Sequence, residues 1–190
     1  MKKARQIVIP EERPLTAEEF YDFFLHARNS SSWYATEYTR SEKQIIEKLL
    51  AKGYIRDDVT YLDKSGVEKK FNIIDEVIVN LKENFLINDE GYAKSLINRY
   101  TDSKRGDGYI RQKLIAKGID SDEATRLIEE NKDDDRNFEN LEYLAGRYRN
   151  SSAYTRVENP FKQKQKLTSH LLSRGFSFGD IREWEDRQEE

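Results

Sequence analysis

The sequence predicts an all-α fold in which three tandem helical repeats form an elongated, curved array. Gly and Pro are scarce, at nine and three of 190 residues, and apolar residues recur at helical spacing along most of the chain. One phrase also occurs three times: apolar residues at helical spacing, then a base, then a glycine followed by a hydrophobic residue. Its glycines are Gly53, Gly118 and Gly175. Repeats of this kind bury their apolar stripes mainly within each unit and stack into an extended body.

Composition limits the class of protein further. Hydrophobic and charged residues each make up 36% of the chain and aromatic residues 12%, which is enough bulky material for a core. The absence of cysteine excludes disulfides, thiolate metal sites and cysteine nucleophiles, and it suits a reducing cytoplasm. No run of about 18 apolar residues occurs, and the N-terminus lacks the apolar region of a signal peptide. We therefore expect a cytoplasmic protein that does not enter a membrane.

Charge is distributed in alternating blocks, although the whole chain carries a net charge of only −3. Residues 104–117 hold five bases and one acid, and residues 147–174 hold seven bases and one acid. Two acidic blocks, at residues 120–135 and 180–190, offset them. The two basic segments are therefore the candidates for contact with an acidic partner.

The first repeat is expected at residues 15–72, after a basic, β-leaning lead-in at residues 1–14. Thr16, with Glu19 three positions later, forms a capping box and predicts the start of a helix. The polar run at residues 29–32 is expected to break or cap this helix, and a helix resumes after it.

A second helix of this repeat is expected to begin after Ser41. Ile45 and Leu49 lie on its apolar stripe, and Gly53 stands where a helix ends on a left-handed residue. Residues 61–71 contain the turn signal D-K-S-G and look like an insertion, either a loop or a small hairpin.

The second repeat is expected at residues 73–130. An apolar stripe predicts a helix over residues 73–85, and Asn88 or Asp89 caps the helix after it. A basic, glycine-containing connector at residues 104–108 then leads to a further helix pair.

The third repeat is expected at residues 131–190. A helical face is followed by a polar connector at residues 150–160 and by the third copy of the repeated phrase, which ends at Gly175. Ile181 and Trp184 belong to a short last helix. Aligned on the glycines, the corresponding stripe residues of the three repeats are Ile45, Ile110 and Leu167, and Leu49, Leu114 and Leu171.

Four phrases of the sequence resemble those of the RecX family of bacterial regulatory proteins. They are R-S-E-K-Q-I-I-E-K-L-L-A-K-G-Y at residues 40–54, F-L-I-N-D-E-G-Y-A-K-S-L-I-N-R at 85–99, G-Y-I-R-Q-K-L-I-A-K-G-I at 108–119 and K-Q-K-L-T-S-H-L-L-S-R-G-F-S-F-G-D-I at 164–181. The resemblance implies three tandem three-helix repeats. It also implies a protein that is not an enzyme and that binds RecA.

The resemblance further implies that the chain lies on the RecA–DNA filament and inhibits its ATPase, strand-exchange and SOS coprotease activities. We expect a monomer without cofactors that binds single- or double-stranded DNA weakly at most. The mildly acidic chain and the insertion at residues 61–71 depart from the family pattern. A helical nucleic-acid-binding adaptor without recombinase contact is the alternative function.

Residues that suggest catalysis or metal binding have simpler explanations. His26 and His170, the only histidines, are expected to have packing or surface roles, and no nucleophile accompanies them. The acidic run at residues 133–135 lacks the ligand spacing of a calcium loop, and we interpret it as a solvated run that ends a helix. The Asp89-Glu90 pair fits a helix N-terminus. The sequence therefore predicts no catalytic site and no metal site.

The basic residues are the candidates for contact with RecA or DNA, although the simpler interpretation is a solvated, ion-paired surface. Tyr109 and Tyr154 lie near them and are candidates for stacking on bases. The spacing of the lysines at 162, 164 and 166 does not fit one helical face, which suggests an extended segment there. The nine candidate residues are Lys104, Arg105, Arg111, Lys113, Arg147, Arg149, Lys162, Lys164 and Lys166.

Overall fold

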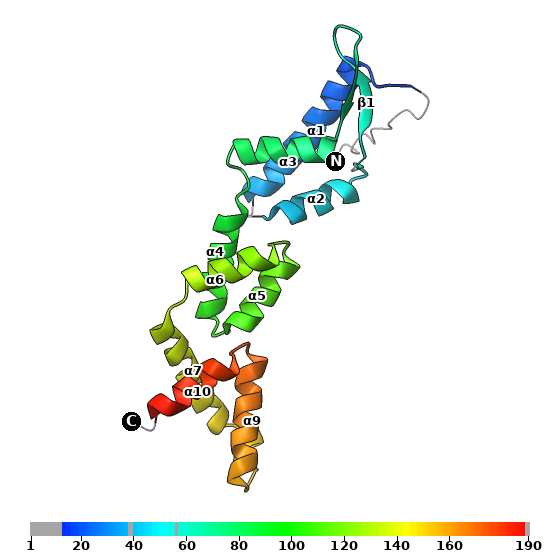
Figure 1. Ribbon diagram of the computed structural model, residues 1–190. Coiled ribbons are helices and arrows are strands. Elements are labelled where there is room, and N and C mark those ends of the chain that lie inside the picture. The colour runs from blue at the N-terminus through cyan, green and yellow to red at the C-terminus, as the bar shows by residue number, and fades with distance from the viewer. Residues whose placement is uncertain (1–12, 38–39, 56, 189–190) are drawn as a thin grey trace. The chain divides into compact units, whose positions relative to one another are not determined.

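The computed structural model describes residues 13–37, 40–55 and 57–188 and is predominantly helical (Figure 1). The predicted all-α class is confirmed, with one small two-stranded sheet added to it. The chain divides into two compact units, Met1–Asp89 and Glu90–Glu190, which we describe separately. The lead-in predicted at residues 1–14 lies almost entirely outside the described residues.

Three helices and a hairpin build the first unit around one hydrophobic cluster. The helices are α1 (Ala17–Glu37), α2 (Glu42–Ala51) and α3 (Ile73–Glu83), and their apolar stripes meet in the interior. Ile45, Leu49 and Leu81 are completely buried, and each contributes about 1.5–3 kcal/mol by leaving water. Ser41 caps α2 as predicted, and Gln44 completes a capping box with it.

Helix α1 is continuous, so the break predicted at residues 29–32 is wrong. Ala27, Ser31 and Ala35 follow one another at four-residue spacing and are all buried. These small side chains let α2 and α3 pack closely against α1. Packing on this face therefore outweighs the poor helix propensity of Ser30, Ser31 and Ser32.

The segment at residues 61–71 belongs to a β-hairpin rather than a loop. Strand β1 (Val59–Leu62) pairs antiparallel with β2 (Glu68–Phe71), and the carboxylate of Asp63 accepts backbone hydrogen bonds from Ser65 and Val67 in the turn. Leu15 continues the pairing, because its amide donates to the carbonyl of Thr60 at 2.9 Å. The hairpin thereby closes one side of the first core.

Helix α3 packs with α1 and α2, whereas the predicted boundary after residue 72 placed it in the second repeat. Its buried residues Ile73, Ile74 and Val77 belong to the same cluster as Ile45. The error has a physical cause, since a stripe in the sequence shows that a helix is buried but not which neighbour buries it.

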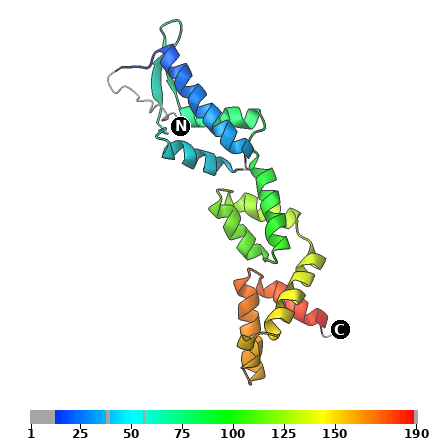
Figure 2. The same ribbon diagram turned by 180° about the vertical axis from the view of Figure 1, so that it is seen from behind.

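The second unit contains two hydrophobic clusters, one after the other along the chain (Figures 1 and 2). The first is shared by α4 (Asp89–Asp102), α5 (Asp107–Ala116) and α6 (Ser121–Glu130). The second is shared by α7 (Asp134–Arg149), α9 (Pro160–Ser173) and α10 (Phe178–Gln188), with the one-turn α8 (Ser152–Thr155) beside them.

The three repeated glycines end their helices in the way the sequence predicts. Gly53, Gly118 and Gly175 have φ values of +89°, +95° and +98°, and the amide after each glycine donates back to a carbonyl in the last helical turn. The same turn closes α3 and α4, but there its left-handed residues are Phe85 and Lys104, with φ values of +55° and +58°.

Candidate partner-binding surface

All nine basic residues predicted for partner binding lie in the second unit, and the structure brings them into several small groups rather than one patch. Their surroundings differ in one respect that matters for binding. Some bases lie against tyrosine rings, where a cation is attracted to the negative face of the ring. Others are held by carboxylates, hydroxyls or backbone carbonyls.

Tyr109 lies between two of the predicted bases. The guanidinium of Arg105 is 4.5 Å from the ring centre and the ammonium of Lys113 is 5.1 Å from it. Lys113 shares a helical face with Tyr109 because the two residues are four positions apart on α5. Tyr100 packs edge-on against the same ring at 5.5 Å. We call Arg105, Tyr109 and Lys113 the Tyr109 group.

Lys104 and Arg105 are adjacent in the chain, but their side chains reach different tyrosines. Lys104 has a left-handed backbone, and its ammonium donates to the Asn140 side-chain oxygen at 3.1 Å. It also lies 4.9 Å from the ring centre of Tyr143 on α7. A left-handed lysine is uncommon because its Cβ crowds the backbone. Here the turn directs one base toward α7 and the next toward Tyr109.

Tyr143 borders a hollow of about 420 Å³ on the second unit. Lys104, Arg147 and Arg174 supply cations to its lining, and Arg147 lies 5.7 Å from the Tyr143 ring centre. Tyr143 is 48% exposed, so its ring remains accessible. Lys104 and Arg147 belong to the set predicted from the sequence, whereas Tyr143 and Arg174 do not, because only the fold brings the ends of α4 and α9 to α7.

His170 also lines this hollow and has the packing role that the sequence analysis expected. Its ring stacks on Tyr148 with centres 4.2 Å apart and planes 13° apart. Burial lowers the pKa of His170, and the nearby charge of Arg174 lowers it further. The imidazole is therefore held in its neutral form more strongly than a solvated histidine would be.

Three lysines of α9 are placed differently from the sequence expectation. The helix begins at Pro160, and the Asn159 side chain accepts from the Lys162 amide at 3.1 Å, so the predicted extended segment is wrong. Lys164 forms an ion pair of 2.9 Å with Glu185, and Lys166 donates to the Ala153 carbonyl at 3.5 Å. These lysines point to different sides of one helix.

Arg111 and Arg149 complete the set of predicted residues. Arg111 is exposed and donates to the Ser121 hydroxyl at 2.9 Å, and Arg149 lies 5.4 Å from the ring centre of the buried Trp184. Neither joins the Tyr109 group or the hollow at Tyr143. Of the two predicted stacking residues, Tyr109 lies between bases, whereas Tyr154 packs edge-on against Tyr148.

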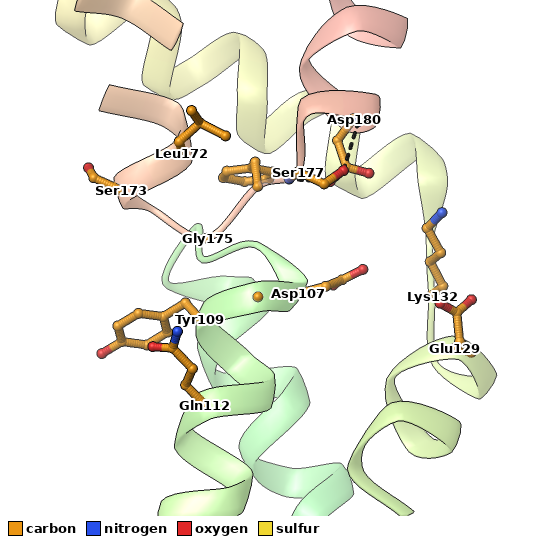
Figure 3. A pocket seen from close by; sticks show the side chains of 12 residues that line it. Asp107, Tyr109, Gln112, Glu129, Lys132, Leu172, Ser173, Gly175, Ser177 and Asp180 are labelled. Carbon is orange, nitrogen blue, oxygen red and sulfur yellow. Dashed lines mark hydrogen bonds between the residues drawn. The ribbon is translucent and has the colours of Figure 1, made fainter. Parts of the chain in front are cut away.

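A second hollow, of about 580 Å³, lies where α5 meets the turn between α9 and α10 (Figure 3). Its charged lining is mainly acidic and consists of Asp107, Glu129 and Asp180 with a single base, Lys132. Burial raises the pKa of Asp107, and the neighbouring Asp180 raises it further. Among the described residues, no group of three or more acidic or histidine side chains could hold a metal ion.

The acidic residues at the starts of α4 and α7 have structural roles. Asp133 begins α7 as its N-cap, rather than ending a helix as predicted, because its carboxylate accepts from the Arg136 amide at 3.0 Å. Asp89 is the first residue of α4, and its carboxylate accepts from the backbone amide of Glu42 at 2.8 Å, so the side chain serves the start of α2. Burial raises the pKa of Asp89.

Comparison with known proteins gives a consistent result. Residues 134–184 match the model of the third three-helix domain of RecX. The chain is 31% identical over 185 residues to the regulatory protein RecX of Clostridioides difficile (strain 630), which covers 96% of this chain and 76% of that protein. It is 28% identical to the regulatory protein RecX of Streptococcus pneumoniae (strain Taiwan19F-14), covering 94% of this chain but only 61% of that protein.

The fold is also that of a solved structure. The crystal structure of RecX from Lactobacillus salivarius matches with a TM-score of 0.71 at 23% identity, over 88% of this chain and 97% of that one. None of the helices in the described part of the chain is both long and apolar enough to cross a membrane.

Proposed function

Because the chain belongs to the RecX family of regulatory proteins, we propose that it is a negative modulator of the RecA recombinase. In this proposal it binds the RecA–DNA filament non-covalently in the cytoplasm and inhibits the ATPase, strand-exchange and SOS coprotease activities of RecA. It acts as a monomer, without catalysis and without a cofactor. The observation that carries the proposal is 31% identity to a named regulatory protein over 96% of this chain.

The basic side chains of the second unit support a charged partner surface. Arg105 and Lys113 lie beside the Tyr109 ring, and Lys104 and Arg147 lie beside the exposed ring of Tyr143. Arginine and tyrosine are enriched in protein interfaces because each combines apolar area with hydrogen-bonding groups. These two groups are the part of the predicted set that we propose for contact with the filament.

Repetition along a filament suits the proposed mechanism. Neighbouring RecA protomers present the same surface again and again, so separate contact groups on one chain can bind adjacent protomers. Once one group is bound, the others act at a high effective concentration, and weak contacts combine into stable binding. A chain bound in this way bridges protomers and hinders both filament growth and ATP turnover.

Co-sedimentation with RecA filaments tests the proposal. Filaments assembled on single-stranded DNA with a slowly hydrolysed ATP analogue are pelleted in the presence of the purified chain. We expect the chain in the pellet at a saturating ratio to RecA. A chain that stays in the supernatant at every ratio contradicts the proposal.

The alternative is a nucleic-acid-binding adaptor that makes no contact with RecA. The cations of the second unit also suit DNA phosphates, and each phosphate contact makes affinity fall with salt, with a slope of roughly −0.9 on duplex or −0.7 on single strands. The same pelleting assay separates the two functions. Equal binding to bare DNA and to RecA-coated DNA favours the adaptor.

A further inference from the structure

The first unit carries an exposed tryptophan beside three cations, none of which belongs to the set predicted from the sequence. Trp33 lies on α1 and is 63% exposed. The other tryptophan of the chain, Trp184, is 1% exposed. A large aromatic side chain that remains in water, in a unit with a well-filled core, is available for contact with a ligand.

The cations come from one side of α2 and from the residue position before its cap. Lys48 and the C-cap residue Lys52 are four positions apart and lie on one side of α2, and Arg40 directly precedes the N-cap of this helix. The ammonium of Lys48 lies 5.4 Å from the ring centre of Trp33 and 3.4 Å from that of Tyr34. Arg40 lies 4.7 Å from the Tyr34 ring centre. We call Trp33, Arg40, Lys48 and Lys52 the Trp33 patch.

Tyr34 and Trp33 have different roles in this arrangement. The Tyr34 ring is partly buried against the core, and it attracts Arg40 and Lys48 and so holds both side chains in place. Lys52 reaches the hydroxyl of Ser30, one turn before Trp33 on α1. The Trp33 ring stays open to solvent beside this row of cations.

Lys48 has like charges as neighbours in the patch. Burial lowers the pKa of Lys48, and the neighbouring charges of Lys52 and Arg40 lower it further. Glu42, at the start of α2, is committed to an ion pair of 2.6 Å with Lys82. An anionic ligand would relieve the repulsion among the three cations.

We propose that the Trp33 patch binds single-stranded nucleic acid, with one base stacked on the Trp33 ring and neighbouring phosphates contacted by Arg40, Lys48 and Lys52. Proteins that bind single strands without sequence preference combine these two elements, an aromatic platform and a basic track. The site lies in the first unit, apart from the residues proposed for RecA contact, and the proposal does not depend on RecA.

A single strand fits the patch better than a duplex or an acidic peptide does. Bases within a duplex are stacked on each other, so their faces cannot reach an indole on a helix surface. An acidic peptide would satisfy the cations but has no flat ring to cover Trp33. The pairing of an exposed ring with clustered cations therefore favours unpaired nucleotides.

The tryptophan content makes this proposal directly measurable by fluorescence. A short oligothymidylate is titrated into the purified full chain, without RecA, and tryptophan emission is recorded. We expect saturable quenching from Trp33, while buried Trp184 gives a constant background. In the Trp33→Phe variant the oligothymidylate should leave the remaining emission unchanged.

Affinity is measured in parallel with a labelled oligothymidylate. Trp33→Ala should weaken binding roughly five-fold to 100-fold, the loss typical of removing one base-stacking ring. Tyr21→Ala is the matched control, because Tyr21 is also on α1 and 59% exposed but belongs to no cation cluster in the described structure. Circular dichroism and thermal unfolding confirm that each variant is folded.

The cations are tested through the dependence of affinity on salt. Lys48→Gln and Lys52→Gln should each reduce the slope of log affinity against log salt by about 0.7, the value for one phosphate contact on a single strand. Lys43→Gln is the control, since it removes the same charge from an exposed position on another face of α2. Its slope should equal that of the wild type.

Four outcomes would overturn the proposal. They are equal quenching in the Trp33→Phe variant, unchanged affinity in Trp33→Ala, equal salt slopes for Lys43→Gln and Lys52→Gln, and competition by polyglutamate or duplex as strong as that by the single strand. Because the assay contains no RecA, these outcomes leave the proposed inhibition of RecA to be judged by its own experiment.

Discussion

The backbone amide of Gly108 donates a hydrogen bond of 2.9 Å to the carbonyl oxygen of Gly175. The amide of Gly106 makes a similar bond of 3.0 Å to the Arg174 carbonyl. The last copy of the repeated glycine phrase thus does more than end a helix, because its turn rests on the first turn of α5 (Figure 3). Two backbones approach here without side chains between them.

Because of this contact, Gly175 should tolerate a side chain less well than Gly53 does. A methyl group on Gly175 would lie 2.4 Å from the Tyr109 amide nitrogen, and its φ of +98° disfavours any side chain. Gly175→Ala should lower the free energy of unfolding by about 2–5 kcal/mol. Urea denaturation followed by circular dichroism measures the loss.

Gly53→Ala is the matched control for this substitution. Gly53 has a similar φ of +89°, but a methyl group there would meet nothing within 4 Å. Gly53→Ala should therefore lower the free energy of unfolding only by the backbone strain, about 1–2 kcal/mol. Equal losses for the two variants would show that the close approach at Gly175 contributes nothing.

The acidic hollow predicts a stabilising substitution with a defined pH dependence. Burial and the charge of Asp180 raise the pKa of Asp107 in the folded state above 3.8. The folded state therefore holds this proton more tightly, and stability is lost as pH rises through the raised pKa. Asp107→Asn, which is neutral at every pH, should raise the free energy of unfolding at neutral pH.

The advantage of Asp107→Asn should shrink as the pH falls below 3.8, where the wild-type carboxyl is protonated in both states. Thermal unfolding from acid to neutral pH measures it. Asp120→Asn is the comparison, because it should lower the free energy of unfolding at neutral pH where Asp107→Asn raises it. Hydrogen bonds from the amides of Asp122 and Glu123 lower the pKa of Asp120, so its charge stabilises the fold above pH 3.8. A pH-independent effect of Asp107→Asn contradicts the argument.

Phe85 offers a second stabilising substitution. It has a left-handed φ of +55°, and its side chain is 92% exposed, so little packing holds it there. Phe85→Gly should raise the free energy of unfolding by about 0.5–1 kcal/mol, the relieved strain minus the greater freedom of the unfolded chain. Phe161 is also exposed, at 70%, but it lies in helix α9. Phe161→Gly should therefore lower the free energy of unfolding by up to about 1 kcal/mol. Urea denaturation measures both changes in the free energy of unfolding. Changes of the same sign in the two variants would refute this explanation.

Local features of the fold could be predicted from the sequence because each depends on residues close together in the chain. The N-cap at Ser41 and the glycine ends of α2, α5 and α9 are set by interactions within one or two turns. The apolar stripes gave the buried residues of these helices for the same reason.

Features that join distant segments could not be predicted in this way. Asp89 accepts from an amide 47 positions earlier, and Gly108 meets a carbonyl 67 positions later, at Gly175. Lys104 and Arg105 are adjacent in the sequence, but spacing alone did not reveal that their side chains reach different tyrosines. The Trp33 patch was missed because α1 and α2 supply it jointly.

Charge reversal tests which residues of the second unit contact the filament. The combined variant Arg105→Glu, Lys113→Glu and Arg147→Glu should raise the concentration needed for half-inhibition of RecA about tenfold or more, the factor expected for a loss of 1.4 kcal/mol. The control variant Lys64→Glu, Lys69→Glu and Lys70→Glu changes the net charge by the same amount, but in the β-hairpin. Its half-inhibition concentration should stay near that of the wild type. Equal inhibition by both variants would show that our contact residues are wrong.

The rate of DNA-dependent ATP hydrolysis by RecA, measured with increasing amounts of the purified chain, tests the central claim most directly. RecA is first assembled on single-stranded DNA, and its rate is followed as the chain is added. The account predicts a dose-dependent fall in the rate that saturates at a fixed ratio to RecA. An unchanged rate at several-fold excess of a folded chain over RecA would contradict it.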